Sequence, residues 1–332
     1  MSALGQPESL DASAATPRLP DFVIVGHQKC GTTALYLTLK EHPQIFMCPS
    51  KEPRFFAPDQ RSVLRQGGSV KHPDTIEGYM RLFQDALPEQ RAGEASPQYL
   101  RSTEAAANIA AAVPQAKIVA ILREPASFLR SLHLQLVHND QETETDFRRA
   151  VELEPERRAG RMIPPGCRSP VALRYSEHVH YTEQLRRFHE AFPAEQVLVL
   201  IYDDFRADNE GTVKRVLRFL GVDEQVPLAP VQTDTLRSVR RPALHRLAGG
   251  LRLARHNPGA TGPATRALNA LVPGFVRTPA FRRRWGRLVY GEPPSADEQF
   301  MVELRRRFLG DVQEISDYLG RDLVSLWGYD RL

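Results

Sequence analysis

A loop with two glycines, one lysine and two hydroxyls follows the first apolar segment, and these groups suit the binding of an oligophosphate. It reads GHQKCGTT from Gly26 to Thr33 and lies between an expected strand, 22–26, and an expected helix, 31–41. A helix N-terminus presents unpaired N–H groups and partial positive charge to an anion. Gly31 permits close approach of the backbone, and Lys29 can neutralise charge on a leaving oxygen. A strand–helix turn with a surface lysine would contain the same residues, but we predict anion contacts for His27, Gln28, Lys29, Cys30, Gly31, Thr32 and Thr33.

The loop differs from the one that binds ATP or GTP in nucleoside triphosphatases. The Walker sequence GxxxxGK[ST] places lysine directly after its second glycine and a hydroxyl on magnesium. Here Lys29 precedes Gly31, and the apolar segment 116–122 is followed by Arg123 rather than by an acid that could hold magnesium. We therefore expect fixed cations, and no metal, to meet the anion. This argues against kinase chemistry, although a metal-dependent P-loop kinase stays an alternative.

Three apolar segments, 22–26, 116–122 and 196–202, are typical of buried strands, and helical spacing lies between and after them. The expected helices cover 31–41, 128–136, 181–192, 212–220 and 297–319, and the charged stretch 143–170 predicts one helix and a surface loop. This alternation predicts an α/β fold with a central parallel sheet flanked by helices. We expect a disordered lead-in over 1–18 and a single domain over 19–332, with a helical, arginine-rich part from about 237.

The composition argues against several classes of protein. The chain has 332 residues, with 42% hydrophobic and 25% charged residues, and is long enough to bury a core without disulfides. Its three cysteines are far apart and form no CxxC pair, which argues against a disulfide framework and a zinc site. The first residues do not resemble a signal peptide, and no apolar run is long enough to span a membrane. We expect a cytoplasmic protein with no nucleic-acid partner.

The segment from Arg237 to Arg287 contains twelve arginines and no acidic residue. It also has leucines at spacings that suit an amphipathic helix. A solvated face would explain this composition. A positive surface toward an anionic donor, an anionic acceptor or a membrane would explain it equally well, so peripheral membrane contact through 237–287 stays open.

Several segments place the phosphate loop in a more specific context. VGHQKCGTT begins at Val25, KEPRFF at Lys51, GEASPQYL at Gly93, LREPASFLRSL at Leu122 and LGRDLVSLW at Leu319. In this order, they resemble the motifs of the sulfotransferases that use 3′-phosphoadenosine 5′-phosphosulfate (PAPS). KEPRFF is similar to a segment of the heparan-sulfate-type branch, and GEASPQYL and LGRDLVSLW resemble bacterial members.

The resemblance implies a P-loop NTPase-like sulfotransferase fold with PAPS as the donor. The loop would hold the 5′-phosphosulfate, and Arg123 and Ser131 would bind the 3′-phosphate. Phe128 stands where the family often has another arginine, a charge that Arg130 can supply. Ala95 stands where heparan-type enzymes carry a lysine, which argues against a glycosaminoglycan acceptor.

The acceptor must lose a proton as it attacks, and the resemblance makes Glu52 the general base. Burial beside Phe55 and Phe56 would raise the pKa of Glu52, and the charge of Lys51 would oppose this rise. A Lys–Glu pair on the surface would also fit these residues. Four histidines are rival bases, namely His27, His133, His178 and His180. The residues predicted to line the acceptor site are Glu94, Ser96, Tyr99, His133 and His180.

These expectations predict one function, and they leave one further alternative besides the kinase. The predicted enzyme moves a sulfuryl group from PAPS to a hydroxyl or amine of a carbohydrate, glycolipid or other small molecule. Lys29 stabilises the leaving phosphate. The alternative is a nucleotide-binding regulator that has lost catalysis.

Overall fold

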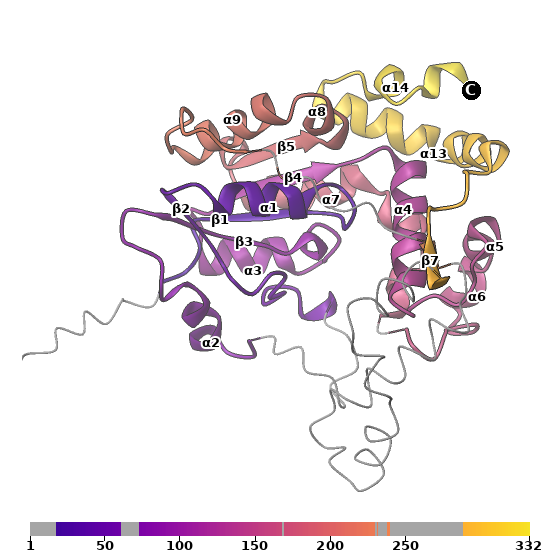
Figure 1. Cartoon of the computed structure of the whole chain (residues 1–332), viewed down its shortest axis with the longest axis horizontal. Helices are drawn as coiled ribbons and strands as arrows, with labels where there is room; N and C mark the ends of the chain where they lie inside the picture. The colour runs from indigo at the N-terminus through magenta and orange to yellow at the C-terminus, as the bar shows by residue number, and fades with distance from the viewer. Residues whose placement is uncertain (1–17, 61–72, 168, 230, 232–237, 240–287) are drawn as a thin grey trace, which may run out of the picture.

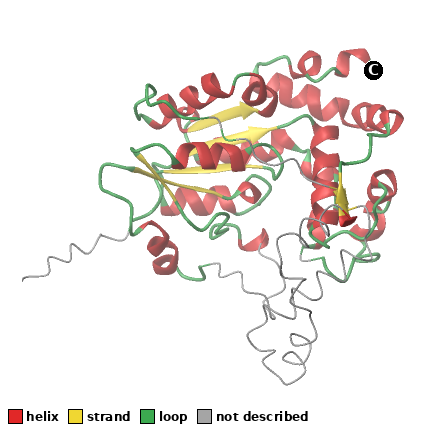
Figure 2. Ribbon diagram, in the orientation of Figure 1, coloured by secondary structure: helices red, strands yellow, loops and turns green. Residues whose placement is uncertain are grey.

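The apolar segment after Asp21 forms the middle strand of a five-stranded sheet. The computed structural model describes residues 18–60, 73–167, 169–229, 231, 238–239 and 288–332. The strands are β1 (Phe22–Gly26), β2 (Ile45–Met47), β3 (Arg91–Ala95), β4 (Lys117–Leu122) and β5 (Val197–Ile201). They pair in the order β2-β3-β1-β4-β5, and every pair is parallel (Figures 1 and 2). The predicted central parallel sheet is therefore confirmed.

Helices connect these strands and flank the sheet. Right-handed crossovers put α1 (Thr32–Lys40) on one face and α3 (Ala105–Ala112) on the other, where α3 packs against α7 (Tyr181–Ala191). The remaining helices are α2 (Ile76–Met80), α4 (Pro125–His138), α5 (Phe147–Glu152), α6 (Glu154–Arg158), α8 (Tyr202–Ala207), α9 (Asn209–Leu220), α13 (Glu298–Leu319) and α14 (Leu323–Leu326). The predicted helices near 31–41, 128–136, 181–192, 212–220 and 297–319 are confirmed.

The strand order brings chemically active segments to one edge of the sheet. Because all five strands are parallel, their carboxyl ends share that edge. Gly26, Ala95, Leu122 and Ile201 end their strands there. β1 lies between β3 and β4, so the connections after β1 and β3 leave in opposite directions. In open parallel sheets, this switch point is where a crevice forms at the carboxyl edge.

Two short helices, rather than the single one predicted within 143–170, follow α4. Pro155 lies in the first turn of α6, and it cannot donate an N–H to extend α5. A buried ion pair fixes this region, since the Arg157 guanidinium lies 2.7 Å from the Glu142 carboxylate and both side chains are at most 1% exposed. Arg157 also donates to the Ala150 carbonyl at 3.0 Å.

The segment after α13 returns to the sheet edge. Arg321 holds Asp204 of α8 with two hydrogen bonds of 2.5 and 2.7 Å, and Trp327 Nε1 donates to Asp203 at 3.0 Å. In Figure 1, the yellow helices α13 and α14 accordingly lie beside α8. The Tyr329 hydroxyl donates to Glu124 at the start of α4, at 2.7 Å. The C-terminal part therefore supports the segments that follow β4 and β5.

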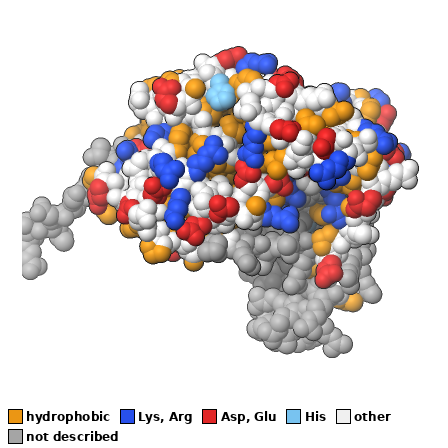
Figure 3. Space-filling view, turned by 90° about the horizontal axis from the view of Figure 1, so that it is seen from above, with side chains coloured by type: hydrophobic (Ala, Val, Ile, Leu, Met, Phe, Trp, Pro, Cys, Tyr) orange, Lys and Arg blue, Asp and Glu red, His pale blue; other side chains and the backbone are white. Residues whose placement is uncertain are grey.

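Several predictions fall on other parts of the chain. Residues 1–17 and 240–287, which contain most of the predicted lead-in and of the arginine-rich segment, lie outside the described residues. Two-residue strands β6 (Ser238–Val239) and β7 (Tyr290–Gly291) pair with each other, antiparallel. Over the described residues, no helix is both long and apolar enough to cross a membrane. On the face drawn in Figure 3, acidic and basic side chains are interspersed.

Candidate active site

The predicted anion loop forms one wall of the larger of two neighbouring cavities. This first cavity has a volume of about 870 Å³. Its walls come from the loop and α1, from Arg123 and one side of α4, from α8, and from residues 293–301 before and within α13. Five of the seven residues predicted to contact the anion line it, namely Gln28, Lys29, Gly31, Thr32 and Thr33.

The start of α1 leaves its backbone N–H groups free to meet an anion. Gly31 is the N-cap with φ 88°, no side chain caps the helix, and the first turn contains no acidic residue. A Cβ atom at position 31 would lie 3.1 Å from the rings of Tyr202 and Phe205, so glycine suits both the backbone conformation and the space. This geometry supports the loop as an anion site.

Two cations of the first cavity are coupled through the loop backbone. Arg123 Nη1 donates to the Lys29 carbonyl at 2.9 Å, and its guanidinium carbon lies 4.7 Å from the centre of the Tyr202 ring. Lys29 adopts φ 70°, which is uncommon for a residue with a side chain. Burial, and then the positive charge of Arg123, lower the pKa of Lys29. A desolvated ammonium beside a second cation favours an incoming anion.

A second cavity of about 290 Å³ adjoins the first one. Gln28, Lys51 and Glu52 line both cavities. The second cavity has amide side chains from Gln60, Gln98 and Gln141, an apolar side that includes Phe128, and the basic residues Arg54, Arg101, His27 and His178. Glu52 thus lies where the anion site meets a second chamber with both polar and apolar walls.

Glu52 is held in one position by its own segment and by β3. Its carboxylate accepts hydrogen bonds from Arg54 Nη2 at 2.7 Å, Gln98 Nε2 at 2.9 Å and Lys51 Nζ at 3.1 Å. Its backbone N–H donates to the carbonyl of Ala95, at 3.1 Å. Glu52 and Arg54 have φ values of 59° and 52°. Such backbone conformations cost energy and persist where the surroundings fix them, often at functional sites.

Burial and Lys51 act on the pKa of Glu52 in the expected directions, but the net shift is downward. Burial does act to raise it, but Lys51, Arg54 and Gln98 together outweigh burial and lower the pKa to about 2. Glu52 is therefore ionised at neutral pH and can accept a proton. Its proton affinity is low while all three donors remain in place.

Glu94, Ser96 and Tyr99 were predicted to line the acceptor site, but they line neither cavity. Glu94 lies within β3 rather than after it, is fully buried, and accepts hydrogen bonds from Tyr79, Tyr99 and Ser96 at 2.8, 2.8 and 2.7 Å. Burial raises the pKa of Glu94 to about 7, against the effect of these bonds. Ser96 Oγ accepts from the Arg54 N–H at 3.1 Å, so this cluster supports the Glu52 segment from behind.

The four histidines named above as rival bases occupy different environments. His27 is buried beside the second cavity, its Nε2 lies 2.8 Å from Gln184 Oε1, and burial lowers its pKa to about 3. His178 lines the same cavity and has a pKa well below its usual value, mainly because of burial. His133 is buried against the Glu144 carbonyl, and His180 is exposed at the N-terminus of α7; neither lines a cavity.

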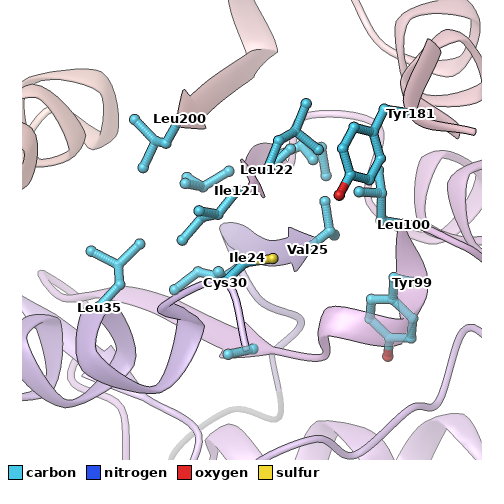
Figure 4. Packing of buried hydrophobic residues seen from close by; sticks show 14 of the residues in the cluster. Ile24, Val25, Cys30, Leu35, Tyr99, Leu100, Ile121, Leu122, Tyr181 and Leu200 are labelled. Atoms are coloured by element: carbon cyan, nitrogen blue, oxygen red, sulfur yellow. The ribbon is translucent and has the colours of Figure 1, made fainter. Parts of the chain in front are cut away.

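Cys30 does not reach the anion site with its side chain. It is fully buried and points among the apolar residues of the core, close to Ile24 (Figure 4). Burial raises the pKa of its thiol to about 12. Cys30 and His27 are therefore the two loop residues predicted to contact the anion that the structure places outside the first cavity.

Ser131 lines the first cavity with Arg123, and the structure adds residues that the sequence analysis did not assign. Ser127 and Gln135 lie one turn from Ser131 on the same side of α4, and Arg130, expected above to supply charge, also lines the cavity. Tyr202, Phe205 and Arg206 come from α8, which directly follows β5. Helical spacing around Ser131 and the position of α8 at the shared sheet edge were the signals that could have identified them.

Comparisons with known proteins agree on one family. Residues 20–225 match the model of the sulfotransferase family. Human bifunctional heparan sulfate N-deacetylase/N-sulfotransferase 3 is 30% identical over 215 residues, with 62% of this chain and 22% of that protein covered. Mouse carbohydrate sulfotransferase 15 is 26% identical over 250 residues, with coverage of 61% and 44%. The chain thus spans less than half the length of these curated relatives.

A solved structure covers more of the chain. The crystal structure of a sulfotransferase from Alicyclobacillus acidocaldarius is 25% identical and superimposes with a TM-score of 0.65, with 93% of this chain and 99% of that one covered. The family match includes the anion loop, the Glu52 segment, β3 and the start of α4. The chain belongs to the sulfotransferase family.

Proposed function

We propose that this protein transfers a sulfuryl group from PAPS to a hydroxyl or amine of a carbohydrate, glycolipid or other small-molecule acceptor. The observation that carries the proposal is the contact between the two cavities at Gln28, Lys51 and Glu52. The first cavity has the cations and helix N-terminus that a phosphosulfate needs. The second cavity offers space for an acceptor, and the heparan sulfate and carbohydrate sulfotransferases among the relatives support a carbohydrate.

Each residue of the first cavity has a distinct part in donor binding. The N–H groups at the start of α1 and the hydroxyls of Thr32 and Thr33 hold the 5′-phosphosulfate, and Lys29 neutralises charge on the leaving phosphate. Arg123 and Ser131 bind the 3′-phosphate. These roles require no metal ion, and a cytoplasmic location stays a prediction.

Glu52 takes the proton of the attacking group at the boundary between the cavities. The carboxylate can accept a further hydrogen bond from an acceptor hydroxyl or amine, because Oε1 accepts only from Lys51 while Oε2 accepts from Arg54 and Gln98. An acceptor that displaced Lys51 or Arg54 would also remove part of what lowers the pKa of Glu52 and would make it a stronger base.

The donor can be identified by its effect on thermal unfolding. We expect 3′,5′-adenosine bisphosphate, the product left by PAPS, to raise the melting temperature by several degrees. A ligand at 100 times its Kd contributes about 2.7 kcal/mol to the free energy of unfolding. ATP with magnesium, at the same concentration, should have little effect. The measurement is differential scanning fluorimetry over a ligand series.

The reverse result, stabilisation by Mg-ATP and not by the bisphosphate, would overturn the proposal in favour of a P-loop kinase. Stabilisation by the bisphosphate with no sulfation of any acceptor by labelled PAPS would favour the regulator. An acceptor screen with labelled PAPS therefore completes this test.

Arg123→Gln should weaken binding of the bisphosphate by roughly 10- to 100-fold, because it removes a charge-assisted hydrogen bond to the 3′-phosphate. Binding of adenosine 5′-monophosphate, which lacks that phosphate, should change by less than about threefold. Titration calorimetry measures both affinities. Arg218→Gln is the matched control, since Arg218 is 69% exposed on α9 and pairs with Glu224. Equal weakening for both nucleotides would instead assign Arg123 to holding the loop through the Lys29 carbonyl.

A further inference from the structure

We infer that Arg101 binds an anionic group of the acceptor, a carboxylate or a phosphate or sulfate ester, within the second cavity. The inference rests on the proposed function and adds the chemical class of the acceptor to it. Arg101 lies after the short 3₁₀ turn Pro97–Tyr99 and lines this cavity together with Glu52.

Neutral groups, rather than a carboxylate, hold the Arg101 guanidinium. Nη2 and Nε donate to Gln60 Oε1 at 2.6 and 3.2 Å, and Nη1 lies 2.8 Å from Nε2 of His178. Burial and the charge of Arg101 itself lower the pKa of His178, so this imidazole is uncharged at neutral pH. Within the described part of the chain, no carboxylate lies within ion-pair distance of Arg101.

The two acids whose charges act most strongly on Arg101, Glu177 and Asp59, bind other groups. Glu177 lies 3.3 Å from Arg158 and 3.6 Å from Arg174. Asp59 accepts from the Ser102 hydroxyl at 2.6 Å and from the Thr103 N–H at 3.0 Å. Burial lowers the pKa of Arg101 to about 10, which leaves it protonated at neutral pH. The one carboxylate among the described residues that line this cavity, Glu52, is bonded to Lys51, Arg54 and Gln98 rather than to Arg101.

Arg157 is a fully buried arginine with a structural role and offers a comparison with the half-buried Arg101. The Glu142 carboxylate lies 2.7 Å from Arg157, and Arg157 lines neither of the two cavities. Burying a charge without a partner is costly. Since Arg101 has no acidic partner among the described residues but does line a cavity, we infer that its partner is a ligand.

The rest of the cavity suits a polar molecule that carries one anion. A guanidinium has five N–H donors. The bonds to Gln60 and His178 use one on each nitrogen, which leaves N–H groups on Nη1 and Nη2 for two oxygens of an anion. Gln98 Oε1 is buried and has no hydrogen-bond partner among the residues that the structure describes, while Gln98 Nε2 donates to Glu52. An acceptor hydroxyl can donate to this oxygen beside the base while its anion contacts Arg101.

The test compares three acceptors that share one sugar ring and differ in charge. The probes are p-nitrophenyl β-D-glucoside, its 6-phosphate and the corresponding glucuronide, with labelled PAPS as donor. The wild-type protein should sulfate at least one charged probe with a kcat/KM about tenfold or more above the neutral glucoside. Arg101→Gln should lower kcat/KM for that probe by roughly 10- to 100-fold. Its effect on the neutral glucoside should be much smaller, and binding of the bisphosphate in the first cavity should not change.

Two further variants keep the test decisive if Arg101→Gln does not fold. Gln60→Glu places a carboxylate on the two nitrogens that now bind Gln60 Oε1, so it should remove the charge preference while Arg101 stays in place. Arg101→Lys keeps the positive charge but loses the paired N–H donors of the guanidinium, so it should retain part of the preference for a charged acceptor. Arg218→Gln, on the surface, is the control.

The charged probe whose kcat/KM falls most in Arg101→Gln identifies the anion as a carboxylate or a phosphate. No charge preference in the wild-type protein, or a preference that survives both Arg101→Gln and Gln60→Glu, overturns the inference. Failure of the proposed function looks different, because the bisphosphate would then fail to stabilise any of these proteins.

Discussion

Glu52→Gln should lower kcat by two to four orders of magnitude and leave binding of 3′,5′-adenosine bisphosphate within about twofold. Removing a general base costs roughly that factor. Glutamine can still accept from Arg54 and Gln98, but it cannot take a proton from the acceptor. Steady-state sulfation and calorimetry on the same preparation measure the two effects.

Glu52→Asp keeps the charge but shortens the reach, so its activity should lie between the other two proteins. Glu210→Gln, an exposed carboxylate that pairs with Lys214 on α9, controls for loss of a surface ion pair. If Glu52→Gln retains wild-type turnover, the base is another group, and His178 in the same cavity is the next candidate. If Glu52→Gln loses nucleotide binding as well, Glu52 is a structural ion-pair partner of Lys51 and Arg54.

Lys29→Met should lower kcat by roughly 100- to 1,000-fold, the typical cost of removing one charge-stabilising donor. The effect should fall on kcat more than on KM, because the leaving phosphate carries more negative charge in the transition state than in bound PAPS. Rapid-quench single turnover with labelled PAPS measures the chemical step directly. Lys40→Met, at the exposed end of the same helix, is the matched control and should be nearly wild type.

The pH profile gives an independent reading of Lys29. Burial and Arg123 lower its pKa, so the charged ammonium is present at low and neutral pH and is lost as pH rises through a value below that of an ordinary lysine. kcat/KM, which reports the groups of the free protein, should therefore show a basic limb at lower pH than an exposed lysine would give. Lys29→Arg, if active, should lack that limb because arginine stays charged. A wild-type profile that is flat to high pH, or the same limb in Lys29→Arg, would contradict the role.

The central strands could be predicted from the sequence, whereas two strands at one side could not be identified fully. β1 and β4 are continuous apolar runs with no exposed residue, which is the pattern of strands buried on both faces. β3 has the sequence RAGEA, which lacks the apolar run of a buried strand. Glu94 is buried there among hydroxyl groups, and Gly93 leaves room for the Phe22 ring. A Cβ atom at position 93 would lie 2.1 Å from that ring. Such tertiary requirements leave no local pattern.

The loop could be assigned to an anion from its own residues, but the electrostatics of Glu52 could not be derived locally. Lys51 is adjacent in sequence and predicts only one of the three donors. Gln98 reaches the carboxylate from beyond β3, 46 residues along the chain. Its contribution, with that of Arg54, reverses the effect of burial on the pKa. The placement of Glu94 and Ser96 behind the site, rather than in it, also depends on packing between distant segments.

The bond from the Tyr329 hydroxyl to Glu124 joins residues 205 positions apart. Glu124 also caps α4 by accepting from the N–H groups of Ala126 and Ser127, directly beside Arg123. During translation, at about 5–20 residues per second, the anion loop and α4 emerge roughly 10–40 seconds before Tyr329 is made. A nascent chain that has not yet reached Tyr329 therefore holds the anion loop but lacks the contact that completes the start of α4. The cap of α4 is expected to reach its final form only once Tyr329 has left the ribosome.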